Sequence, residues 1–204
     1  MSLRGLTVTT KNAIVTSERA LLLKHAKYIP PPNMINEYPN EDALRIFYRR
    51  FIRLKPLISQ RQTVRTTYVH YLRYKFKSED YAKKISMSAV TLPQVTHSTL
   101  EEVENSLLFC LKAVSYVKKR VPSEEIVSKD IRIAKNIVKN ILTVEFEKAA
   151  LIAKNPRQNH PILRISFSYL SPKASSSPLY LRFSPFKEFD QCLILLNETL
   201  KTRL

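Results

Sequence analysis

The chain has 204 residues, of which 44% are hydrophobic and 25% charged, so it is long enough to bury one core and is not disordered in composition. Its 34 Lys and Arg outnumber 17 Asp and Glu, and the resulting net charge of +17 favours an anionic partner such as nucleic acid, an acidic protein or an anionic membrane surface. A single glycine excludes glycine-rich nucleotide-binding loops, and four scattered histidines show no metal-ligand spacing, so we expect no cofactor, no metal and no enzymatic activity.

Residues 1–38 form a basic N-terminal arm. Within its first 35 residues, five Lys and Arg oppose one acid, Glu18, among many Thr and Ser. This balance is typical of a mitochondrial presequence and equally of an ordinary basic arm that lies across the fold. We therefore divide the chain into this arm, with targeting as one of its two interpretations, and a single helical domain at 39–204.

Four amphipathic helices are predicted next, near 41–55, 60–77, 99–120 and 124–153. Asn40 is a suitable N-cap for the first. Capping-box spacing marks the starts of the second and the third, in Ser59 with Gln62 and in Ser98 with Glu101. Apolar residues recur at helical spacing in all four, so the helices should pack as a bundle.

The hydrophobic period changes to two in the C-terminal part. Alternation over 163–169 and again over 179–183 predicts two half-buried strands that pair as a β-hairpin. Ser184 then caps a last helix with Pro185 at its first position, and this helix should dock on its own bundle. The predicted fold class is mainly α (α+β), with a bundle of about four helices and a C-terminal hairpin-helix appendage at about 161–204.

Several apolar residues of these helices are predicted to be buried, namely Leu107, Leu111, Ile137, Ile141, Leu193 and Leu196. Both cysteines, Cys110 and Cys192, lie in apolar runs and are predicted to be buried thiols, which suits a reducing compartment. Charged residues interrupt every apolar stretch within a few turns, so no membrane span is expected.

The segment 43–78 contains ten basic residues and no acid. Without carboxylates in the same helices, these cations repel one another unless an anion or an acidic neighbour relieves them. Interleaved tyrosines can stack on bases, although Tyr68 and Tyr71 have the spacing of core residues. We take this segment as the candidate anion-binding and partner-binding surface rather than an ordinary solvated face; its chosen residues are Arg45, Arg49, Arg50, Arg53, Arg61, Arg65, Arg73 and Lys75.

The run Phe47-Tyr48-Arg49, followed by Phe76 and a third amphipathic helix, resembles the Leu-Tyr-Arg motif family of three-helix mitochondrial proteins. Phe47 stands in place of the family's Leu, and the resemblance covers about residues 40–120. It implies a helical bundle of that type. It also implies that the chain binds the acylated mitochondrial acyl carrier protein and serves as an assembly factor or a subunit.

A second resemblance covers nearly the whole chain. It is carried by the segments 9–14, 47–51, 53–56, 74–76, 196–200 and 202–204. These segments resemble the increased recombination centers protein 19 family, which is also described as required for respiratory growth. The resemblance implies a protein of the mitochondrial matrix with a role in mitochondrial DNA maintenance and sporulation, and it supplies no catalytic residues.

Two functions of different classes therefore stay open. The first is a basic, non-enzymatic mitochondrial protein that supports genome maintenance by binding nucleic acid or a nucleoprotein assembly, such as the mitochondrial ribosome or the nucleoid. The alternative is a Leu-Tyr-Arg-type assembly factor or scaffold for the acyl carrier protein. Retention on heparin up to high salt is expected of the first, and co-purification of a small acidic protein is expected of the second.

Overall fold

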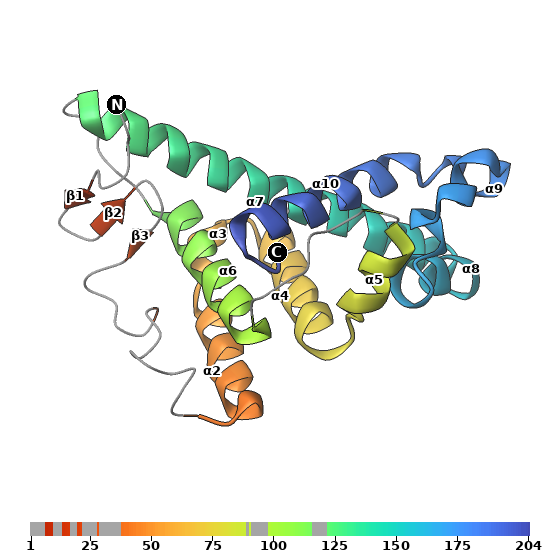
Figure 1. Cartoon of the computed structure of the whole chain (residues 1–204), viewed down its shortest axis with the longest axis horizontal. Helices are drawn as coiled ribbons and strands as arrows, with labels where there is room; N and C mark the ends of the chain where they lie inside the picture. Colours follow the sequence, from red (N-terminus) through yellow and green to blue (C-terminus); the bar gives the residue numbers. More distant parts are fainter. Residues whose placement is uncertain are drawn as a thin grey trace.

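The computed structural model describes the backbone of residues 7–9, 14–16, 20–21, 28, 38–88, 90, 98–115 and 122–204, and the side chains of these residues from 28 onward except 122–127. Helices dominate this part of the chain (Figure 1). The α-helices are α2 (Asn40–Arg53), α3 (Lys55–Ile58), α4 (Gln62–Lys77), α5 (Tyr81–Ser88), α6 (Thr99–Val114), α7 (Pro122–Lys154), α8 (Pro156–His160), α9 (Pro178–Leu181) and α10 (Ser184–Leu200). The mainly α class is thereby confirmed, and α2, α4, α6 and α7 confirm the four predicted helices.

Three short strands form an antiparallel sheet that the sequence analysis did not predict. They are β1 (Thr7–Thr9), β2 (Ile14–Thr16) and β3 (Ala20–Leu21), in the order β1-β2-β3. In Figure 1 the sheet lies near α6 and the start of α7, and contacts join β3 to α6 and β1 to α7. Most other residues of the predicted arm lie outside the described part, but Tyr28 is buried in the main core.

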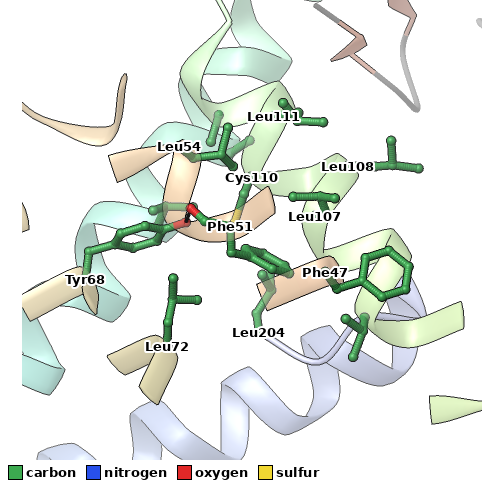
Figure 2. Packing of buried hydrophobic residues seen from close by; sticks show 14 of the residues in the cluster. Phe47, Phe51, Leu54, Tyr68, Leu72, Leu107, Leu108, Cys110, Leu111 and Leu204 are labelled. Carbon is green, nitrogen blue, oxygen red and sulfur yellow. Dashed lines mark hydrogen bonds between the residues drawn. The ribbon is translucent and has the colours of Figure 1, made fainter. Parts of the chain in front are cut away.

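The main core lies where α2, α4, α6 and α7 bury their apolar faces together. Figure 2 shows side chains of α2, α4 and α6 converging in it, with the Tyr68 hydroxyl donating a hydrogen bond of 2.9 Å to the carbonyl of Phe51. The burial of a tyrosine is thus offset by a hydrogen bond that also joins α4 to α2. Of the residues predicted to be buried, Leu107, Leu111, Ile141 and Leu193 are buried, and Ile137 and Leu196 are partly buried against them.

The two cysteines differ from each other. Cys110 is buried as predicted, and burial raises the pKa of its thiol to about 12. Cys192 is exposed, so the prediction for it was wrong. It directly precedes Leu193 on α10, and successive helical residues point about 100° apart, so an apolar run cannot bury all of its members.

One of the four predicted helix caps is confirmed, and the prediction for Ser184 is wrong because Ser184 is already the first residue of α10, with Phe183 at the cap position. Ser98 and Glu101 form a capping box at the start of α6, because each side chain accepts a hydrogen bond from the other residue's backbone N–H. Asn40 is instead already helical. The short helix α3 places Ser59 before the start of α4, where its hydroxyl accepts from the N–H of Arg61. The helix α6 ends at Val114, and residues 116–120 of the predicted helix lie outside the described part.

The predicted C-terminal β-hairpin is wrong. Its residues form the π-helical turn η2 (Pro161–Ile165), the 3-10 turns η3 (Ser168–Leu170) and η4 (Pro172–Ser176), and then α9. Prolines begin η2, η4 and α9, because a fixed φ suits the first turn of a helix and a missing N–H does not suit a strand pair. The alternation was also partly a coincidence, since Phe167 and Tyr169 are buried but Ile165 is 53% exposed.

These turns enclose a second, smaller core at the end of the molecule opposite the strands (Figure 1). Its buried members include Leu163, Phe167, Tyr169, Leu170 and Phe183. The helix α10 joins the two cores, because its Phe186 belongs to the small core and its Leu193 to the main one. This arrangement confirms that α10 docks on its own bundle.

Residues 201–204 fold back onto the helices after a left-handed residue, Lys201, with φ 53°. The buried Asn197 holds them, since its amide nitrogen donates to the carbonyl of Leu204 at 3.0 Å and its amide oxygen accepts from the N–H of Leu204 at 2.8 Å. The N–H of Arg203 donates to the hydroxyl of Ser106 on α6 at 2.7 Å. The C-terminal segment is thereby fixed against the bundle.

Candidate functional site

The α2 helix separates apolar and cationic side chains, as its sequence predicts. Phe47 and Phe51 are buried, while Arg45, Arg49 and Arg53 recur every four residues and are exposed. Arg45 has acidic neighbours in the first turn of the helix, with Asp42 at 2.9 Å and Glu41 at 3.5 Å. These exposed pairs stabilise the helix only weakly.

Farther along α2 the arginines affect one another. Arg50 is half-buried, and burial followed by the nearby charge of Arg53 lowers the pKa of its guanidinium. Burial is the larger cause of this shift, and a nearby negative charge would offset the smaller contribution of Arg53. An anion bound at this surface would act in that direction.

The basic residues of α4 are distributed over several environments. Arg73 is exposed, and Arg65 donates from Nε to the carbonyl of Ser59 at 2.6 Å. Arg61 lines a groove together with Lys135 and Lys139 of α7. Lys75 lies apart from the exposed arginines, because its ammonium is 2.5 Å from the carboxylate of Glu79 and only 8% of its side chain is exposed. We use the name arginine surface for the other seven: Arg45, Arg49, Arg50 and Arg53 of α2 with Arg61, Arg65 and Arg73 of α4.

Two aromatic residues of the Leu-Tyr-Arg-like motif, Tyr48 of α2 and Phe76 of α4, pack against each other. Phe47 is fully buried, and the Phe76 ring lies edge-on to Tyr48 and Phe51 with centroid distances of 5.4 and 5.8 Å. Arg49 lies on the other side of the same helix and is exposed. Tyr68 and Tyr71 belong to the core, as their spacing indicated.

A partly open cavity of about 240 Å³ lies beside these rings. Phe51, Tyr68, Leu72 and Phe76 provide much of its apolar lining, together with residues of α6 and α7. The exposed residues Lys77 and Thr99 lie at its margin, and Lys75 and Arg203 also line it. An apolar cavity of about 150 Å³ is known to hold a ring of benzene size, so this one is large enough for a small apolar group.

A buried network of ion pairs, which the sequence analysis did not predict, connects the main core to the small core. Asp190 of α10 is at its centre, 2.7 Å from Lys148 of α7 and 3.1 Å from Lys84 of α5. It also accepts a hydrogen bond from the hydroxyl of Tyr169. The ion-pair network comprises Lys75, Glu79, Lys84, Glu145, Lys148, Arg164 and Asp190.

The charges around Asp190 stabilise one another in the charged state, whereas burial outweighs Glu79 and lowers the pKa of Lys75. Burial alone would raise the pKa of Asp190, but Lys148 and Lys84 and the hydrogen bonds lower it well below its usual range. Burial likewise opposes the charge of Lys84, yet Asp190 and Glu79 raise its pKa above the ordinary value. The pKa of Glu145 is lowered in the same way, because the positive charges of Lys148 and Arg164 outweigh the effect of its burial. The network is therefore held together by charge, and its enclosed position indicates a structural role.

The sequence contains a signal for the central anion of this network. On α10 the residues Phe186, Asp190, Leu193 and Asn197 are spaced four, three and four apart, which places Asp190 and Asn197 on the core-facing stripe. Both are buried. A charge on an apolar stripe requires a partner, and the pattern alone does not say which cation supplies it.

The described residues contain neither a cluster of metal-binding side chains nor a candidate membrane span. No group of three or more His, Cys, Asp and Glu side chains in that part of the chain is arranged to hold a metal ion. Within the same part, none of the helices has both the length and the apolar character of a membrane span.

Comparison with known proteins gives one consistent result. The family model for increased recombination centres protein 19 matches residues 8–204. Relatives named increased recombination centers protein 19 include those of Vanderwaltozyma polyspora, 35% identical over 100% of this chain and 99% of the relative, and of Zygosaccharomyces rouxii, 36% identical over 98% and 99%. The relative from Saccharomyces cerevisiae S288c is 33% identical over 98% of each chain. No solved structure matches the chain.

Proposed function

The chain belongs to the increased recombination centres protein 19 family, and we propose that it is a non-enzymatic protein of the mitochondrial matrix that supports genome maintenance and respiratory growth by binding nucleic acid. The family name refers to recombination, which is a process of the genome. The mitochondrial location and the molecular activity belong to our proposal, together with the roles in respiratory growth and sporulation.

The observation that supports nucleic acid most directly is the arginine surface. On α2, Arg49 and Arg53 are exposed on the same face, and burial, followed by the charge of Arg53, lowers the pKa of Arg50. A row of phosphates would neutralise such a surface and release its own counterions, which is the main source of affinity in sequence-independent binding. Arginine also matches phosphate in geometry, since its planar guanidinium donates two parallel hydrogen bonds.

This contact can be made either on mitochondrial DNA or on the RNA of a nucleoprotein assembly such as the mitochondrial ribosome. The two partners are distinguished by a native pull-down of the tagged chain from isolated mitochondria, followed by mass spectrometry with and without DNase or RNase. We expect nucleoid or ribosomal proteins whose recovery depends on one nuclease, and we expect Arg49→Ala with Arg53→Ala to reduce it. Absence of the chain from the matrix, or nuclease-resistant recovery that the variant does not change, would overturn the proposal.

A second function, binding of the acylated mitochondrial acyl carrier protein, is favoured by the cavity in the bundle. Phe76 of the Leu-Tyr-Arg-like motif lines this apolar cavity, and so does Phe51 of α2. Arg49 is exposed on α2 as well. An acyl chain would occupy the cavity while arginines contact an acidic carrier.

The carrier hypothesis makes its own prediction in the same pull-down. A small acidic protein should be recovered in stoichiometric amount and without dependence on nuclease. Arg49→Ala should abolish this complex by removing a charge, and Phe47→Ala should weaken it by loosening the helix that presents the arginine. Wild-type recovery of the carrier with Arg49→Ala would reject this function for the motif.

A further inference from the structure

The helices α4 and α7 line a groove between them. Two adjoining hollows of about 660 and 1000 Å³ make up this groove. Both are lined by Thr63 and Thr67 of α4 and by Phe146 of α7, so the phenyl ring lies where the hollows meet. Phe146 is 55% exposed, although it is a large apolar residue.

The charged side chains that line the first hollow, of about 660 Å³, are all positive. Arg61, Lys135 and Lys139 line the first hollow, and no carboxylate is among its lining residues. Glu145 is the one acid that lines the second hollow, and it is already paired with Arg164 at 2.6 Å and with Lys148 at 3.3 Å. Thr63 and Thr67 line both hollows. A threonine hydroxyl can donate a hydrogen bond to a phosphate oxygen, whereas the Thr67 hydroxyl, which already donates to the carbonyl of Thr63 at 3.0 Å, can accept one from a sugar hydroxyl.

We propose that this Phe146 groove, defined by Arg61, Thr63, Thr67, Lys135, Lys139 and Phe146, binds single-stranded nucleic acid. The cations hold the phosphates, and the phenyl ring stacks on a base. This combination of a basic groove and an exposed aromatic platform is what sequence-independent single-strand binding requires. A duplex does not fit the same contacts, because its bases are stacked and paired inside the helix and cannot reach a ring in a groove.

The inference deepens the proposed nucleic-acid function, on which it rests, by naming the form of the nucleic acid and a second binding region, which shares Arg61 with the arginine surface. It is tested by fluorescence anisotropy with the full chain, using a labelled oligothymidylate and a duplex of equal length. We expect Phe146→Ala to weaken single-strand binding on the order of tenfold and to leave duplex binding unchanged. Phe146→Tyr, which retains a ring, should bind like the wild type.

The contribution of charge is tested with a matched pair of variants. Lys135→Ala with Lys139→Ala should weaken single-strand binding and flatten its salt dependence by about 1.4, which is two contacts at about 0.7 each. Lys154→Ala with Arg157→Ala removes the same charge from exposed positions outside the groove lining and should have a much smaller effect. Circular dichroism of each variant verifies that the helices are retained.

Three results would overturn the Phe146 groove. One is single-strand binding by Phe146→Ala equal to that of the wild type, and the second is an equal loss of duplex binding in that variant. The third is loss of binding to phosphatidylserine vesicles in the lysine variant with unchanged single-strand binding, which would assign the cations to a membrane surface. If Arg49→Ala with Arg53→Ala weakens nucleic-acid binding while Phe146→Ala does not, the groove fails and the proposed function stands.

Discussion

Among single residues, Asp190 has the largest consequences for the fold. It lies in the first half of α10, and its carboxylate forms ion pairs with Lys84 of α5 and Lys148 of α7 and accepts a hydrogen bond from the hydroxyl of Tyr169 in η3. Only 1% of its side chain is exposed. Removing one charge from such a buried group leaves the opposite charges buried without compensation. The resulting loss of folding stability exceeds the net stability that the intact ion pair contributes.

Asp190→Asn should therefore lower the free energy of unfolding by about 3–5 kcal/mol, because Lys84 and Lys148 then share a site without its central anion. Asp130→Asn is the matched control, since Asp130 is 32% exposed and pairs only at 3.5 Å with Lys112. The control should lose about 1 kcal/mol or less. Urea denaturation measures both, and equal losses would mean that the network does not hold α10.

The same residue predicts how stability depends on pH. The pKa values of Asp190 and Glu145 are lower in the folded chain than in the unfolded chain, so the unfolded state takes up protons first as pH falls. Their contribution is complete above the ordinary carboxyl pKa of about 4 and is lost progressively below it. Urea unfolding from pH 7 to pH 3 should show this decline. Asp190→Asn should make the decline shallower, and an unchanged slope would contradict the assignment.

At the scale of elements, helices with strong periodicity were predicted well and the C-terminal turns were not. Amphipathic spacing located α2, α4, α6 and α7 because each helix buries one stripe against the others. The region after residue 161 shows alternation over only a few residues, and there three prolines and the left-handed Phe167 decided the backbone. A short alternation is consistent with several backbones, whereas a proline excludes some of them outright.

The candidate sites follow the same division. The cationic stripe of α2 follows from spacing along one helix, so sequence was sufficient to predict it. The Phe146 groove and the ion-pair network each combine residues from elements far apart in the chain, such as Arg61 with Lys139 and Lys84 with Asp190. Their assembly depends on packing that a linear pattern does not encode. Lys75 shows the difference, since it belongs to the basic segment in sequence and to the buried network in space.

The start of α6 offers a test of local structure. Ser98→Ala removes one half of the capping box and should lower the free energy of unfolding by about 0.5–2 kcal/mol. Ser184→Ala is a suitable control, because Ser184 is exposed and begins α10 without capping it. Thermal unfolding of the two variants should differ accordingly. Equal stabilities would show that the capping box does not stabilise α6.

At the scale of the whole molecule, charge is distributed in two ways. In the interior, cations and anions of the ion-pair network connect α4, α5, α7 and α10, and these charges pair with one another. Most of the net charge of +17 therefore lies at the surface, and the arginine surface and the Phe146 groove both contribute cations to it. Two basic areas on one small protein allow it to hold a strand by its backbone at more than one place, which increases affinity without base specificity.

The central claim, that the arginine surface binds nucleic acid, is tested most directly by the salt dependence of affinity. With about five phosphates neutralised, the logarithm of affinity for duplex DNA should fall with the logarithm of salt concentration at a slope near −4 to −5. Arg49→Ala with Arg53→Ala should flatten this slope by about two and leave sequence preference unchanged. Lys154→Ala with Arg157→Ala serves as the control of equal charge. A wild-type slope in the arginine variant would contradict the account and would make these arginines an ordinary solvated face.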